Sequence, residues 1–166
     1  GRTAPLARID DGNGNYTMIA HDRMHVGQEV STGHGAEIKT GNTSYLGSIP
    51  EGTKVYNVEM KPGDGGKLAR SAGQAAVIIS HGKQTIVRLP SKAQKTLDNM
   101  CRATVGTVAG SGRGEKPIAK AGKNFHRNRA RPKVWPKVRG VAMNAVDHPH
   151  GSGRKQTVGV QSTVSR

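Results

Sequence analysis

The sequence predicts an all-β protein, built as one small barrel with long irregular arms. Strand-like segments of five to eight residues recur between turns, and no segment has the length and amphipathic pattern of a crossover helix. Apolar residues gather between Val55 and Val108, although Leu, Ile, Val and Phe make up only 29 of the 166 residues. Such a low content is typical of disordered chains, so we expect the arms to become ordered only on a partner.

The strands are predicted where β-branched or aromatic residues lie between turn residues. Six segments meet this description: residues 16–20, 53–60, 75–80, 84–89, 96–97 and 103–108. Between the third and fourth, His81, Gly82 and Lys83 predict a three-residue hairpin loop. We expect very little helix. The single Cys101 excludes an internal disulfide and a cysteine-based zinc site, and its strand-like context predicts a small buried side chain in a reducing compartment.

Charge is distributed unevenly along the chain. Residues 1–60 carry a net charge of −2, whereas residues 61–166 carry +17. Residues 113–139 alone hold ten Lys or Arg, one acid and three prolines that prevent a long helix. A solubilising surface would mix the two signs, and membrane binding would need an uninterrupted amphipathic helix. Binding to a nucleic-acid backbone therefore explains the charge best. No apolar run has the length of a membrane span, and the first residues do not resemble a secretory leader.

The basic segment also contains groups suited to RNA. Arg127, Arg129 and Arg131 alternate, which suits an extended segment that contacts phosphates. Phe125, His126 and Trp135 offer flat faces for unstacked bases. For Trp135, anchoring the arm to the barrel is an equally good explanation.

Two glycine clusters lie next to basic residues. Gly63, Gly65 and Gly66 precede Lys67, and a second cluster, residues 110–114, includes Arg113. The glycines either form barrel turns or offer backbone N–H groups to phosphates. Neither cluster has the spacing of a P-loop, which argues against a nucleotide-hydrolysing enzyme.

Catalytic and metal-binding hypotheses centre on residues 147–151, Asp-His-Pro-His-Gly. Asp147, His148 and His150 resemble part of a metal site, and an imidazole is the usual general base. No further ligand stands at a fixed local spacing, and no hydrolase motif is present. A proline-stiffened loop whose imidazoles contact RNA explains the same residues better.

The chain resembles the family of the universal large-ribosomal-subunit protein number two, in its archaeal form. The stretches that carry the resemblance are residues 41–43, 49–52, 59–67, 101–104, 120–123, 135–136, 139–144 and 146–151. The resemblance implies part of an oligonucleotide-binding-type barrel at residues 1–36, a Src-homology-3-like barrel at residues 37–112, and a basic rRNA-penetrating extension at residues 113–166. Against the family's pattern the chain starts inside the first barrel and stops before a basic tail, so we expect a fragment.

The resemblance also implies a function. Family members are structural constituents of the large ribosomal subunit in the cytoplasm, bind its rRNA and other ribosomal proteins, and support subunit association, tRNA placement and the architecture near the peptidyl-transferase centre. We expect no enzymatic activity, no homo-oligomer and no cofactor beyond rRNA-associated magnesium. A contact with the small subunit at the subunit interface is left open. A free-standing RNA-binding factor or chaperone and a metal-dependent RNA enzyme remain alternatives. The expected rRNA contacts are Lys67, Arg70, Arg113, Lys116, Lys120, Lys123, Phe125, His126, Arg127, Arg129, Arg131, Lys133, Trp135, Lys137, Arg139, Met143, Asn144, His148, His150, Arg154 and Lys155.

Overall fold

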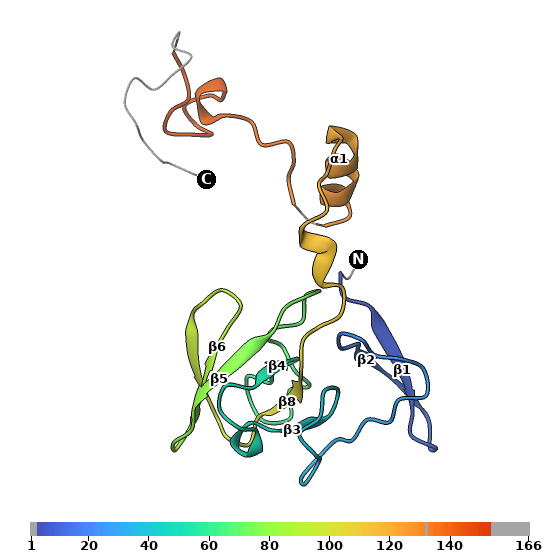
Figure 1. Cartoon of the computed structure of the whole chain (residues 1–166). Coiled ribbons are helices and arrows are strands. Elements are labelled where there is room, and N and C mark those ends of the chain that lie inside the picture. Colours follow the sequence, from blue (N-terminus) through green and yellow to red (C-terminus); the bar gives the residue numbers. More distant parts are fainter. Residues whose placement is uncertain (1–2, 132, 154–166) are drawn as a thin grey trace. The chain divides into compact units, whose positions relative to one another are not determined.

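The computed structural model describes residues 3–131 and 133–153 (Figure 1). Two compact units divide the chain, Arg2–Pro117 and Ile118–Arg166. The first unit contains every strand of the described residues: β1 (Leu6–Asp10), β2 (Asn15–Ile19), β3 (Thr43–Tyr45), β4 (Lys54–Tyr56), β5 (Ala76–Ser80), β6 (Thr85–Arg88), β7 (Gln94–Leu97) and β8 (Arg102–Val105). This content confirms the all-β prediction. Short 3-10 turns lie at Leu46–Ser48 (η1), Ser111–Gly114 (η2) and Gly140–Ala142 (η3).

Strands β1 and β2 form a two-stranded antiparallel sheet. Leu6 pairs with Ile19 and Asp10 with Asn15. The carboxylate of Asp11 closes the turn, because its Oδ1 atom accepts hydrogen bonds from the backbone N–H of Asn13 and Gly14 at 3.1 and 2.8 Å. Short polar side chains that bind the backbone in this way favour tight turns.

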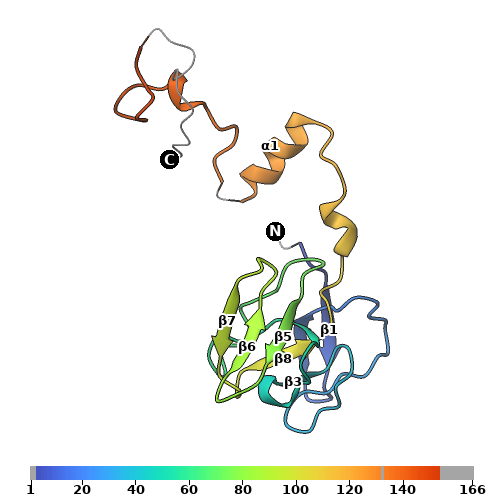
Figure 2. The ribbon, with the colours of Figure 1, turned by 60° about the vertical axis from the view of Figure 1, so that its left-hand side comes forward.

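The other six strands form one antiparallel sheet in the order β3-β8-β4-β5-β6-β7. Figure 2 shows β5, β6 and β7 side by side in this sheet. Strands β5 and β6 form the hairpin that the sequence predicts, but its loop spans four residues, 81–84, rather than three. The register shifts within β5 between Ile78 and Ser80. Such a bulge bends its strand and increases the local twist.

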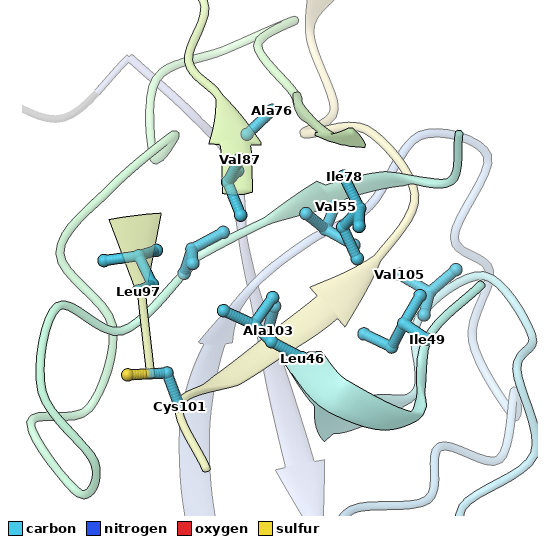
Figure 3. Packing of buried hydrophobic residues seen from close by; sticks show 11 residues of the cluster. Leu46, Ile49, Val55, Ala76, Ile78, Val87, Leu97, Cys101, Ala103 and Val105 are labelled. Carbon is cyan, nitrogen blue, oxygen red and sulfur yellow. The ribbon is translucent and has the colours of Figure 1, made fainter. Parts of the chain in front are cut away.

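Aliphatic side chains from β4, β5, β6, β7 and β8 and from the turn η1 point toward one another and form the core (Figure 3). Full burial of a Val, Leu or Ile side chain stabilises a fold by about 1.5–3 kcal/mol. Cys101 is completely buried among them, as predicted, and burial raises the pKa of its thiol. The core consists of Leu46, Ile49, Val55, Val58, Ala76, Ile78, Val87, Leu97, Cys101, Ala103 and Val105.

A smaller cluster joins the β1–β2 hairpin to the larger sheet. Tyr56 packs with Ile19, Val108 and Ala4, and its hydroxyl donates a 3.1 Å hydrogen bond to the Ile19 carbonyl. Burial raises the pKa of Tyr56, so the phenol keeps the proton that this bond requires.

The predicted strand at residues 53–60 is interrupted at Asn57. Its φ of 50° places the backbone in the left-handed region, where a strand cannot continue. Pairing resumes as an isolated bridge between Val58 and Leu68. The sequence prediction also missed β1 and β3.

The second unit contains a nine-residue helix, α1 (Ala121–Arg129), where we expected an extended segment. His126, Arg127 and Arg129 lie in its last turn, where positive charge complements the negative end of the helix dipole. The described part of this unit buries only Asn128 and His148, both polar, so it has no apolar core there. No helix among the described residues is long and apolar enough to cross a membrane.

Candidate nucleic-acid interface

A buried carboxylate organises the glycine-rich loop after Val58. Glu59 is 2% exposed, and its two oxygens accept hydrogen bonds from the N–H groups of Gly63 and Gly65 at 3.2 and 3.1 Å. The same carboxylate accepts bonds from the backbone N–H of Arg102 at 2.9 Å and from its guanidinium at 3.1 Å. Burial alone would raise the pKa of Glu59, but the four hydrogen bonds outweigh burial and lower it below the ordinary value.

A second carboxylate completes the loop. Asp64 accepts backbone hydrogen bonds from Met60, Lys61 and Gly66 at 3.0 to 3.3 Å, and it lies 3.7 Å from the ammonium of Lys67. Desolvation raises the pKa of Asp64, but the three backbone hydrogen bonds and the charge of Lys67 together outweigh it and lower the pKa overall. The N–H groups of the three loop glycines are therefore committed to Glu59 and Asp64. The hypothesis that they hold phosphates is wrong for this cluster.

The loop holds two basic side chains in different ways. Lys67 is exposed, whereas Arg70 is half-buried and donates a 2.9 Å hydrogen bond from Nη1 to the carbonyl of Gly66. Arg102 is held by Glu59 at the same end of the sheet. Sequence reasoning missed Glu59 and Arg102, because only the pairing of distant segments brings them together.

The arm is the basic extension that begins at residue 113, and its described part exposes most of the predicted contact residues. Among the described residues from 113 onward, the exposed ones are Arg113, Lys116, Lys120, Lys123, Phe125, His126, Arg127, Arg129, Lys133, Lys137, Arg139 and Asn144. Half-buried ones are Arg131, Trp135, Met143 and His150, and Arg154 and Lys155 lie outside the described residues.

Helix α1 changes how the arginines are presented. Successive residues of an α-helix are about 100° apart, so Arg127 and Arg129 point in directions about 200° apart. Lys123 and Arg127, four residues apart, share a face instead. The prediction that Arg127 and Arg129 form one extended row with Arg131 is therefore wrong. Phe125 remains 41% exposed, with its ring edge-to-face against His126 at 5.6 Å.

Residues 140–152 form a loop closed by its own backbone. Ser152 donates a 3.0 Å hydrogen bond to the Met143 carbonyl, and the N–H groups of Asp147 and His148 both bond to the Asn144 carbonyl. Gly151 donates to the His148 carbonyl at 2.9 Å. The loop is therefore compact without any apolar core.

His148, rather than His150, lies at the centre of this loop. Its side chain is buried, and its Nδ1 accepts a 3.0 Å hydrogen bond from the backbone N–H of His150. That donor requires a lone pair on Nδ1, so the ring carries its proton on Nε2. A Cβ at Gly140 would overlap the His148 ring. Three or more His, Cys, Asp or Glu side chains do not gather at a metal-binding distance anywhere in the described residues.

A small all-β barrel joined to a basic, largely exposed arm is the architecture of a polyanion-binding protein. The family model described as Ribosomal Proteins L2, C-terminal domain, matches residues 39–166. Large ribosomal subunit protein uL2 of Methanococcus maripaludis is 56% identical over 169 residues, which cover 100% of this chain and 70% of that protein. The uL2 protein of Korarchaeum cryptofilum is 50% identical over 168 residues, with 100% and 69% covered.

These matches show that the chain belongs to the ribosomal protein L2 family, in its archaeal type. They confirm the resemblance found in the sequence. The C-terminal domain of this family is a Src-homology-3-like barrel, which agrees with the all-β structure described above.

Proposed function

We propose that the chain is a structural protein of the large ribosomal subunit, where it binds large-subunit rRNA in the cytoplasm. The observation that carries this proposal is the second unit: of its described Lys and Arg residues all but the half-buried Arg131 are exposed, and its described part has no apolar core. Such a segment gains its order from the anions it contacts. The names of the archaeal relatives, all large ribosomal subunit proteins, support the same assignment.

The mechanism is electrostatic. Each Lys or Arg that neutralises a phosphate releases counterions, which gives strong affinity, steep dependence on salt and little base specificity. Arginine adds bidentate contacts to phosphate that lysine cannot make. In this assignment residues 1–36 are part of an oligonucleotide-binding-type barrel, residues 37–112 form the second barrel, and residues 113–166 penetrate the rRNA.

The loop at residues 140–152 has a supporting role near the peptidyl-transferase centre in this proposal, and the protein helps subunit association and tRNA placement. The buried His148, whose Nδ1 is already bonded to backbone, fits a group that shapes a loop rather than one that moves protons. No enzymatic step and no cofactor are assigned to the chain, and magnesium at the interface would belong to the rRNA.

Fractionation tests the proposal. We expect the chain to co-sediment with the large subunit at low salt and to leave it only at high salt, together with other tightly bound ribosomal proteins. A chain found mainly outside the subunit would instead favour a free-standing RNA-binding factor. Turnover of an RNA substrate by the purified chain would favour an enzyme.

A further inference from the structure

A series of hydrogen bonds links the loop between β5 and β6 to two other turns of the first unit. His81 begins this loop, and its ring bonds through Nε2 to the carbonyl of Ile49 at 2.8 Å and through Nδ1 to the hydroxyl of Thr85 at 3.2 Å. The Thr85 hydroxyl donates a 2.7 Å hydrogen bond to Oδ1 of Asn99, and Nδ2 of Asn99 donates one of 3.1 Å to the carbonyl of Gly82. Four bonds therefore run in series from one backbone carbonyl to another.

Both ends of this series are carbonyls, which only accept, so each of the four bonds needs a proton from a side chain between them. The Thr85 hydroxyl supplies one proton. The Asn99 amide supplies another, because it faces the series with one N–H and one oxygen. A neutral imidazole adds only one proton, whereas an imidazolium carries one on each ring nitrogen and adds two. The series is therefore complete only when His81 is protonated.

This count does not depend on how the Asn99 amide is turned. The opposite orientation would direct Nδ2 toward Thr85 but would place Oδ1 against the Gly82 carbonyl, so the missing proton would only move to another bond of the series. The acceptors that face the ring belong to buried residues, since Thr85 is 0% and Ile49 1% exposed. Buried acceptors that lose their donor are costly.

The charged residues next to the site, in the segments packed against it, are Glu51 in the turn before β4, Asp98 in the β7–β8 turn and Lys83 in the loop itself. Glu51 accepts a 2.9 Å hydrogen bond from the backbone N–H of His81, and Asp98 accepts one of 2.8 Å from that of Met100. The ring of His81 bonds to neither carboxylate, and its two partners are the uncharged groups of the series.

We propose that His81 is a proton-binding site that closes the β5–β6 loop. The imidazolium holds the loop to Ile49 and, through Thr85, to the β7–β8 turn. Loss of the proton breaks one bond of the series and loosens the loop. The contribution of this bond is therefore present at acid pH and is lost as the pH rises through the range of about 5 to 8, in which histidine changes its charge. The inference goes beyond the proposed function, because the site needs no RNA.

The test uses the full chain, labelled with ¹⁵N-histidine and free in solution. At about pH 5, long-range ¹H–¹⁵N NMR should show a hydrogen-bonded proton on both ring nitrogens of His81. Raising the pH to about 8 should remove one of these two protons. The protection factor of the His81 amide, whose bond to Glu51 reports closure of the loop, should then fall by about 2- to 12-fold, the loss typical of one hydrogen bond.

Two variants and a control isolate the imidazole. His81→Gln does not titrate, and Thr85→Val removes the acceptor of the second ring proton, so in both the protection factor should be the same at the two pH values. His25→Gln removes an exposed histidine and should keep the wild-type pH dependence. If Thr85→Val does not fold, the comparison of the wild type with His81→Gln decides. A single bonded ring proton at about pH 5, equal protection of the wild type at both pH values, or a pH dependence that persists in His81→Gln would overturn the inference.

Discussion

At the scale of single residues, one carboxylate accounts for the shape of the glycine-rich loop. Glu59 accepts four hydrogen bonds from three residues, two of them glycines of the loop and the third Arg102 on β8. A buried carboxylate satisfied in this way is stable, whereas a buried donor left without its acceptor is costly. The loop is therefore formed by the barrel before any RNA arrives.

Replacing Glu59→Gln should lower the free energy of unfolding of the full chain by about 1–3 kcal/mol, because the amide NH₂ faces donors and leaves some of them unpaired. Urea denaturation at pH 7 measures the change. The control is Glu37→Gln, which removes an exposed ion pair with Lys39 and should cost about 0–1 kcal/mol.

The wild type and Glu59→Gln should also differ in how their free energy of unfolding depends on pH. The pKa of Glu59 is lower in the folded state, so its contribution to stability is fully present above the ordinary glutamate pKa of about 4.3 and is lost as the pH falls through the folded value. The stability difference between the wild type and Glu59→Gln should thus stay constant above about pH 5 and shrink below it. A difference that is independent of pH down to acid unfolding would contradict the assignment.

Gly140 is a second residue whose role follows from its surroundings. Gly140→Ala places a methyl group on the His148 ring, so we expect the loop at residues 140–152 to open and incorporation into large subunits to fall. The stoichiometry of the chain in gradient-purified particles measures this. Gly122→Ala, where a Cβ meets nothing, is the control and should assemble like the wild type. Equal incorporation of the two variants would show that the loop tolerates a displaced His148.

His150 and His148 should behave differently in assembled particles. His150→Gln keeps a hydrogen-bonding side chain that does not titrate near neutrality, and we expect peptidyl transfer to remain largely intact. His148→Ala removes the acceptor for the His150 N–H and should impair assembly or subunit joining. The measurement is single-turnover peptidyl transfer across pH 6–8. A loss of about 10²–10⁴ in rate for His150→Gln would indicate a general base.

At the scale of elements, α1 determines which cations act together. Lys123 and Arg127 lie one turn apart on one face, whereas Arg129 points elsewhere. The double variant Lys123→Ala/Arg127→Ala should flatten the salt slope of rRNA binding by about two units if each residue contacts one phosphate. Lys54→Ala/Arg88→Ala removes two exposed cations of the barrel and should leave the slope nearly unchanged. Equal effects of the two double variants on the salt slope would contradict the proposal that the basic extension makes most of the phosphate contacts.

The elements differ in how far the sequence could predict them. The β5–β6 hairpin was predictable, because β-branched residues flank a short polar loop and both strands are local in sequence. β3 was not, since its three residues pair with β8 about sixty residues later. Helix α1 was missed because charge and flanking prolines were given more weight than the proline-free stretch between them. The basic contact residues follow from composition and stay predictions, while the series of hydrogen bonds at His81 exists only after distant segments pair.

At the scale of the whole molecule, the two units differ in what holds them together. The first has two apolar clusters, whereas the described part of the second buries only polar side chains. Ordering the backbone costs about 1–2 kcal/mol per residue, which the described part of the second unit does not offset by apolar burial. In the free chain, amides of β4, β5, β6 and β8 should therefore resist hydrogen exchange while those of residues 118–153 exchange freely.

Addition of large-subunit rRNA should slow exchange in residues 118–153 and change it little in the core strands. Hydrogen-exchange mass spectrometry of the free and bound chain measures both. Strong protection of residues 118–153 without RNA would reveal a stable unit that is independent of its partner.

The two edges of the six-stranded sheet affect whether the free chain aggregates before assembly. Exposed edge strands invite pairing with a second copy and lead to aggregation. β7 is only four residues long and carries Lys95, while β3 is covered by residues 31–33, whose backbone bonds with Thr43 on both sides. Neither edge offers a long, flat ladder to another molecule. The free chain should therefore resist self-association through its sheet edges before it binds RNA. Its excess positive charge adds repulsion between copies of the chain.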